Sequence, residues 1–311
     1  MGAFTISTRS LRQSGIANRV QASRSVSRST SGCDQFRYLN RRTLILEPAP
    51  ECVRLARLAD SDKGIVEVRL ERPEAKNAIG KEMLRGLRHH LGLISEDASA
   101  NVVLLTSCVP KVFCAGADLK ERREMNASEI HSFVNSLRST FSFLEALQVP
   151  TIAVIEGAAL GGGLEMALSC DIRICGENAV MGLPETSLAI IPGAGGTQRL
   201  PRLVGKSTAK ELIYTGRRVT GREALTLGLV NHCAPAGEAH AKALEIARNI
   251  NEKGPLALRM AKRAIDRGLE ADKESAMEVE EDCYVQLLNT TDRLEGLAAF
   301  AEKRKPVYKG E

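Results

Sequence analysis

Residues 156–165 read Glu-Gly-Ala-Ala-Leu-Gly-Gly-Gly-Leu-Glu, and this stretch decides the fold of the chain. The apolar, β-branched run at 150–155 predicts a buried strand before it, and residues 164–168 predict the beginning of a buried helix after it. Amide N–H groups at a helix N-terminus have no partner within the helix, so they can bind an oxygen atom of a ligand. The three glycines therefore predict an oxygen-binding turn, and a plain strand-to-helix turn is the alternative interpretation.

Two carboxylates accompany this turn. Glu165 lies in the otherwise apolar segment 164–168, and Glu185 is the only ionisable residue between Asn178 and Gln198. A lone glutamate is most often a solvated surface charge. Apolar surroundings, however, raise the pKa of a carboxyl group into the range in which it exchanges protons. We therefore treat Glu165 and Glu185 as candidate acid–base residues.

The glycine-rich segments do not match nucleotide-binding loops. Residues 193–198 read Gly-Ala-Gly-Gly-Thr-Gln and lack the third glycine of the G-x-G-x-x-G pattern. Residues 205–207 read Gly-Lys-Ser, like the end of a phosphate-binding loop, but Leu200 occupies the position of the first glycine that such a loop needs. The sequence therefore predicts no nucleotide cofactor.

Three motifs carry a resemblance to a known family. They are G-A-A-L-G-G-G-L-E at 157–165, G-L-P-E at 182–185 and I-P-G-A-G-G-T-Q-R-L at 191–200. With these motifs the chain resembles the enoyl-CoA hydratase (crotonase) superfamily, from about Gly64 to the C-terminus. The resemblance implies an α/β fold in which β-β-α units coil into a right-handed spiral, followed by a C-terminal helical trimerisation region. It also implies a homotrimer or a homohexamer.

The N-terminal head differs in composition from the rest of the chain. Residues 1–42 hold eight arginines, no lysine, eight serines and one aspartate, a net charge of +7, whereas the remainder holds 35 basic and 37 acidic residues. An Arg-rich, Ser-rich and acid-poor head is typical of an organelle transit peptide. We therefore expect residues 1–45 to be a mitochondrial transit peptide and the mature protein to lie in the matrix; a disordered basic tail is the alternative.

The remaining domain boundaries combine composition and periodicity with the spiral architecture that the resemblance implies. We expect a linker rich in Pro and Glu at 46–56, the spiral core at 57–249 and the helical region at 250–311. The alternation of apolar and charged side chains predicts a strand at 65–70, with Glu67 and Arg69 on its polar face. Apolar residues at helical spacing predict helices at 80–95 and from Asn126 to about residue 147. Further helices are expected at 208–215, 221–227, 238–253, 255–268 and 273–288.

Neither a membrane span nor a metal site is predicted. No apolar run reaches the roughly 18–20 residues needed to cross a bilayer. The eight cysteines form no C-x-x-C pair, so we expect free thiols, mostly in the core.

The resemblance assigns roles to particular residues. It implies an oxyanion hole made by the backbone amides of Ala117 and Gly162, with Glu165 activating water and Glu185 delivering a proton to C2 of the substrate. Because isomerases of the superfamily commonly lack one of these acids, the pair favours a hydratase, and an enoyl-CoA isomerase remains an alternative. Coenzyme A is part of the substrate, so no separate cofactor is expected. The expected coenzyme A contacts are Lys76, Ala78, Ala115, Gly116, Asp118, Leu119 and Lys120.

The acyl group and a second function stay open. Segments 113–122 and 292–300 look much like methylglutaconyl-CoA hydratase, an AU-rich RNA-binding homologue, so the substrate belongs to fatty-acid or branched-chain amino-acid breakdown. RNA binding would use Lys81, Arg85 and His89, which share one face of the predicted helix at 80–95. No aromatic platform accompanies them, and a solvated helix face is the preferred interpretation.

Overall fold

Two sheets form the centre of the protein, whose computed structural model describes residues 52–311. The larger sheet has the strand order β1-β2-β3-β5-β7-β10 and the smaller one β4-β6-β8-β9. The strands of the larger sheet are β1 (Val53–Arg57), β2 (Ile65–Leu70), β3 (Val102–Ser107), β5 (Thr151–Ile155), β7 (Ile172–Gly176) and β10 (His232–Ala234). Those of the smaller sheet are β4 (Val112–Cys114), β6 (Ala158–Leu160), β8 (Val180–Gly182) and β9 (Val219–Thr220).

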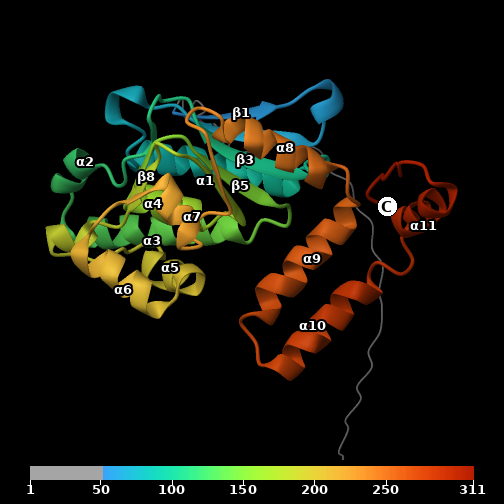
Figure 1. The fold of residues 1–311 in the computed structure, drawn as a ribbon. Helices are drawn as coiled ribbons and strands as arrows, with labels where there is room; N and C mark the ends of the chain where they lie inside the picture. The colour runs from blue at the N-terminus through green and yellow to red at the C-terminus, as the bar shows by residue number, and fades with distance from the viewer. Residues whose placement is uncertain (1–51) are drawn as a thin grey trace, which may run out of the picture. The chain divides into compact units, whose positions relative to one another are not determined.

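Helices surround and follow the sheets (Figure 1). They are α1 (Lys81–Glu96), α2 (Leu119–Arg123), α3 (Ala127–Glu145), α4 (Gly162–Leu168), α5 (Gly196–Val204), α6 (Lys206–Thr215), α7 (Gly221–Thr226), α8 (Ala239–Asn251), α9 (Pro255–Gly268), α10 (Lys273–Val285) and α11 (Thr291–Glu302). Short 3₁₀ turns are η1 (Asp60–Asp62), η2 (Pro73–Ala75) and η3 (Glu185–Leu188). The helices expected at 80–95, 255–268 and from Asn126 onward are thus present.

The strands alternate between the two sheets in a repeated pattern. β3 adds to the larger sheet and β4 to the smaller, and the pairs β5–β6 and β7–β8 repeat this step, each followed by helix. Neighbouring strands of these units are parallel, whereas β1 with β2 and β8 with β9 are antiparallel. The β-β-α architecture expected from the resemblance is therefore confirmed.

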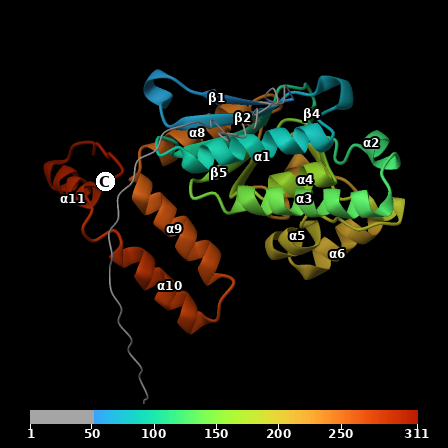
Figure 2. The same ribbon diagram turned by 180° about the vertical axis from the view of Figure 1, so that it is seen from behind.

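Both faces of the larger sheet are buried. On one face Val103 and Leu105 of β3 join a core that α1 and α3 cover; on the other, Val102 and Leu104 meet α8 (Figure 2). α8 presents three fully buried alanines at spacings of four, Ala239, Ala243 and Ala247. Small side chains on one helical stripe allow α8 to lie close to the sheet.

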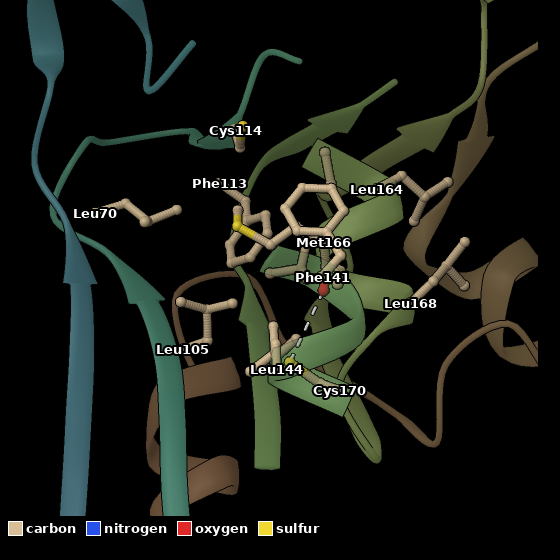
Figure 3. Packing of buried hydrophobic residues seen from close by; sticks show 14 of the residues in the cluster. Leu70, Leu105, Phe113, Cys114, Phe141, Leu144, Leu164, Met166, Leu168 and Cys170 are labelled. Carbon is tan, nitrogen blue, oxygen red and sulfur yellow. Dashed lines mark hydrogen bonds between the residues drawn. The ribbon is translucent and has the colours of Figure 1, made fainter. Parts of the chain in front are cut away.

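The larger core reaches the helix that carries the candidate site. In Figure 3, Phe113 from β4, Phe141 from α3 and Met166 from α4 gather at its centre. All three side chains are at most 1% exposed. Because interiors are packed as densely as organic crystals, this contact fixes α4 against the strand that leads to Ala117.

Three sequence expectations differ from the structure or lie outside it. Residues 53–56 of the expected linker at 46–56 belong to β1, which pairs antiparallel with β2, so the fold begins before Arg57. Glu67, expected on a polar face, is 1% exposed because α8 covers that face, and its carboxylate lies 2.8 Å from Nε2 of His240. The transit peptide expected at 1–45 lies outside the described residues.

The last three helices carry uncovered apolar side chains. α9 and α10 pack side by side, and α9 has no buried residue. Ile265, Leu269 and Phe300 are 61%, 81% and 86% exposed. Within residues 52–311, no helix is both long enough and apolar enough to span a bilayer.

Candidate active site

Two backbone amides from different units of the fold lie side by side. α4 begins at Gly162, immediately after Gly161, whose φ of +51° turns the chain out of β6. Ala117 follows β4 and forms an isolated bridge with Ile79. A Cβ atom on Gly162 would lie 3.8 Å from the amide nitrogen of Ala117. Within the described residues neither amide donates an internal hydrogen bond, so both are available to one oxygen atom.

Glycine is required where these segments meet. A Cβ atom on Gly163 would lie 2.3 Å from the carbonyl oxygen of Cys114, and one on Gly116 would lie 2.8 Å from that of Leu160. Gly116 also has a φ of +99°, in the left-handed region that L side chains rarely adopt. These glycines thus allow two backbones to approach each other closely, a role that was not predicted for them from the sequence.

Glu165 is buried in the first turn of α4. Its side chain is 3% exposed, and Oε1 accepts hydrogen bonds of 2.8 Å from the amides of both Ala194 and Gly196. Burial raises the pKa of Glu165, and the two N–H donors oppose that rise by stabilising the carboxylate. The sequence did not single out Ala194 and Gly196 as partners, although its I-P-G-A-G-G motif contains both.

Glu185 begins the 3₁₀ turn η3, on the other side of the glycine turn. A Cβ atom on Gly161 would lie 3.0 Å from Glu185 Oε1, so this carboxyl group faces the entrance of α4. Its Oε2 is buried and has no hydrogen-bond partner within the described part of the chain. Burial, and then the charge of Glu165, raise the pKa of Glu185 to about 7. A carboxyl group with this pKa is present in both its protonated and its ionised form near neutral pH, so it can give up or take up a proton there.

Asn77 organises the loop that carries Ala117. Its side chain is fully buried: Nδ2 donates to Ser107 Oγ at 2.8 Å and to the carbonyl oxygen of Phe113 at 2.9 Å, and Oδ1 accepts from the amide of Arg72 at 2.8 Å. Asn77 was not singled out from the sequence, because two of its partners lie 30 and 36 residues away.

The residues expected to contact coenzyme A come from two segments that adjoin the amide pair. The amide of Ala115 donates to the carbonyl oxygen of Lys76 at 3.1 Å, and the amide of Ile79 donates to that of Gly116 at 2.8 Å. Lys76, Leu119 and Lys120 are exposed there, and Ala78 is half-buried. The fold therefore brings segments 76–78 and 115–120 together.

Asp118 has internal partners that the sequence did not reveal. Its carboxylate caps α2 by accepting from the amides of Lys120 and Glu121, and it forms an ion pair of 2.9 Å with Arg72. Arg72 in turn donates to the carbonyl oxygen of Ala78 at 2.8 Å. These contacts give Asp118 a role in holding both segments, in addition to the coenzyme A contact expected for it.

The fold and the site together define an enzyme of the crotonase fold, with two free amides beside one buried and one half-buried carboxyl group. The sequence model of the family described as "Enoyl-CoA hydratase/isomerase" matches residues 60–311. This chain belongs to that family.

Close relatives agree with this assignment. The chain is 68% identical, over 86% of its length and 90% of the relative, to a protein of Arabidopsis thaliana named "Probable enoyl-CoA hydratase 2, mitochondrial". It is 48% identical to mouse methylglutaconyl-CoA hydratase, mitochondrial, over 83% of this chain and 84% of that one. The crystal structure of an enoyl-CoA hydratase from Bacillus anthracis superposes with a TM-score of 0.82 at 47% identity, covering 84% of this chain and all of the other.

Proposed function

We propose that this protein is an enoyl-CoA hydratase, which adds water across the 2,3 double bond of a 2-enoyl-CoA thioester to give the 3-hydroxyacyl-CoA. The observation that carries the proposal is a pair of carboxyl groups, buried Glu165 and half-buried Glu185, next to a turn with free amides. Hydration needs a group that takes a proton from water and one that gives a proton to carbon, and this site offers both. Double-bond isomerisation needs only one such group.

The amides of Ala117 and Gly162 would bind the thioester oxygen. Negative charge develops on that oxygen when water attacks C3, and two preorganised N–H donors stabilise it in the transition state. Gly162 also stands at the N-terminus of α4, where the helix dipole favours negative charge. Removing one donor of such a pair typically costs several kcal/mol of transition-state stabilisation.

The two carboxyl groups would divide the proton transfers. Two N–H donors stabilise the ionised form of Glu165 against the rise in pKa that burial causes, and this form would accept a proton as the water oxygen bonds to C3. Glu185, with a pKa raised to about 7, would deliver its proton to C2. The product gains one water in total, and the proton held by Glu165 must return to Glu185 before the next turnover.

Substrate binding and cellular context complete the proposal. Segments 76–78 and 115–120 would contact coenzyme A, which is part of the substrate. The relatives carry mitochondrial names, and this supports a matrix location with residues 1–45 as a transit peptide. The acyl group would come from fatty-acid β-oxidation or from branched-chain amino-acid breakdown, and methylglutaconyl-CoA is the branched candidate.

Assembly into a trimer, or a pair of trimers, would cover the apolar helices. α9–α11 expose Ile265, Leu269 and Phe300, which soluble proteins rarely leave uncovered as a group. Sedimentation of the chain beginning at residue 46 tests this, because a monomer would leave these residues in water.

An activity screen tests the proposed reaction. The protein is incubated with crotonyl-CoA, longer 2-enoyl-CoA thioesters and methylglutaconyl-CoA, and hydration is followed as loss of the ultraviolet absorbance of the conjugated thioester. Glu165→Gln serves as the inactive control. Incorporation of oxygen from ¹⁸O-labelled water into the product is expected; a shifted double bond without that label would make the protein an isomerase.

A further inference from the structure

A single peptide unit connects the guanidinium group of Arg138 with the carboxylate of Glu165. The carbonyl oxygen of Gly193 accepts hydrogen bonds from Arg138 Nε at 3.2 Å and Nη2 at 3.0 Å. The amide at the other end of this same peptide, that of Ala194, donates to Glu165 Oε1 at 2.8 Å. Because the two ends of a trans peptide point in opposite directions, Arg138 fixes the direction in which this N–H points.

Arg199 holds the next peptide unit. Its Nη1 donates to the carbonyl oxygen of Ala194 at 3.0 Å, and its Nε and Nη2 form a two-pronged ion pair with Glu145 at 2.9 and 2.7 Å. The Arg199 side chain is only 11% exposed. Gly195 has a φ of +114°, and a Cβ atom there would lie 1.9 Å from Arg199 Nη1, so the guanidinium group fits only against glycine.

Arg138 and Glu145, the ion-pair partner of Arg199, lie on one face of α3. Arg138 and Glu145 are seven residues apart, which places them two turns apart on the same side of the helix. Val134, one turn before Arg138, lies within 3.2 Å of the position that a Cβ atom on Gly193 would take. α3 therefore forms a rigid support behind residues 193–196, and Glu165 lies on the opposite side of that loop.

The charges of the two arginines also reach the carboxylate. Burial raises the pKa of Glu165; besides the amides of Gly196 and Ala194, the positive charges of Arg199 and Arg138 lower it. An amide whose carbonyl accepts a charged donor is itself polarised and becomes a stronger donor. The amide hydrogen bonds and the positive charges of the two arginines therefore both favour the ionised form of Glu165, and the hydrogen bonds also fix its position.

We propose that Arg199 and Arg138 are positioning residues for Glu165: they hold the 193–196 backbone so that its two amides stay aimed at the carboxylate. Neither arginine is assigned a contact with the substrate. The inference rests on the proposed function, because it assigns Glu165 the task of accepting a proton from water. Preorganised supporting contacts of this kind hold a reacting group within a fraction of an ångström of its working position.

The test compares Arg199→Gln, Arg199→Lys and Arg138→Gln with a matched control, Arg202→Gln. Arg202 lines the same surface hollow of about 510 Å³, yet it pairs with Glu270 and the carbonyl oxygen of Gln198 and touches neither Gly193 nor Ala194. Circular dichroism and thermal unfolding check that each variant is folded.

Two readouts distinguish positioning from a purely structural role. For Arg199→Gln we expect kcat to fall about tenfold, the lower end of what supporting residues contribute at other sites, with KM changed less than about twofold. Removing a positive charge also raises the pKa of Glu165, so the acid limb of the pH profile moves to higher pH. Arg199→Lys, which keeps the charge, should recover part of both effects, and Arg202→Gln should show neither.

A titration separates this inference from the proposed function. Carbon-13 NMR of the Glu165 carboxyl group reports its pKa without any substrate. If the wild type hydrates no enoyl-CoA but this pKa still rises in Arg199→Gln and Arg138→Gln, the proposed function fails and the positioning role stands. If the folded variants keep both the wild-type kcat and the wild-type Glu165 pKa, the positioning role is wrong.

Discussion

Glu185 titrates under the influence of Glu165: burial, and then the negative charge of Glu165, raise the pKa of the Glu185 carboxyl group to about 7. The two groups differ in their partners. Glu165 accepts two amide hydrogen bonds, whereas one oxygen of Glu185 is buried and has no hydrogen-bond partner among residues 52–311. The amide hydrogen bonds favour the ionised form of Glu165 against the effect of burial, and the raised pKa of Glu185 favours its protonated form. A reaction that moves one proton in each direction needs such a pair.

The first prediction is that Glu165 and Glu185 act as one unit. Replacing either by Gln keeps its size and removes proton transfer, so each single change should lower kcat about 10²–10⁴-fold. The double variant should lose far less than the product of the two losses, because the second change removes a group that is already idle. Multiplicative losses in the absorbance assay would show that the two residues act independently.

The second prediction concerns the pH dependence of hydration. Because Glu185 must be protonated to deliver a proton to C2, kcat/KM should decline as pH rises through about 7, the pKa of Glu185. At low pH, kcat/KM should decline as Glu165 becomes protonated, because its ionised form is needed to accept a proton from water. A profile of kcat/KM between pH 5 and 9 measures both limbs, and a rate that stays constant from pH 6 to 9 contradicts the role given to Glu185.

The third prediction links Glu185 to stability. Its pKa is about 7 in the folded protein and near the ordinary 4.5 in the unfolded chain. Stability due to the protonated form is therefore complete below about pH 4.5 and is lost as pH rises to about 7. Glu185→Gln has no such loss, so it should raise the melting temperature at pH 8 and leave it nearly unchanged at pH 4.5. An equal change at both pH values would disprove this account.

The fourth prediction concerns Asn77. Asn77→Ala removes three side-chain hydrogen bonds and leaves buried partners unsatisfied, so we expect a loss of about 2–4 kcal/mol in the free energy of unfolding. Asn77 has a φ of +54°, which alanine tolerates poorly. Asn77→Gly relieves that strain and should be less damaging. Urea denaturation measures the difference, and a loss below 1 kcal/mol for alanine would refute the organising role.

The fifth prediction uses two glycines that differ only in their surroundings. A methyl group on Gly163 would meet the carbonyl oxygen of Cys114 at 2.3 Å. One on Gly92 in α1 would meet no atom of residues 52–311 within 4 Å, apart from the backbone of its own helix and its chain neighbours. Gly163→Ala should therefore displace α4 from the Ala117 loop and abolish activity. Gly92→Ala should raise stability by about 0.5–1 kcal/mol, because alanine favours a helix interior. Normal activity in Gly163→Ala would show that the close approach is dispensable.

Local patterns were enough to predict much of the fold. A helix start at Asn126 was predicted, and the structure has a capping box there, formed by Asn126 and Glu129. The helix at 255–268 has the predicted ends because Pro255 and Gly268 mark them. Such signals lie within a few residues of each other, so they can be recognised without knowing what packs against them.

By itself the sequence determined which groups the candidate site contains: the glycine turn at Gly162, the small residues around Ala117 and the carboxylates at 165 and 185. Only the tertiary structure decided what controls those groups. The amides that donate hydrogen bonds to Glu165 lie 29 and 31 residues later in the sequence. His240, which contacts the carboxylate of Glu67, lies 173 residues away from it. These contacts depend on how the β-β-α units and α8 pack in the folded protein. The charge state of a side chain depends on its burial and its neighbours, and no local sequence pattern specifies these.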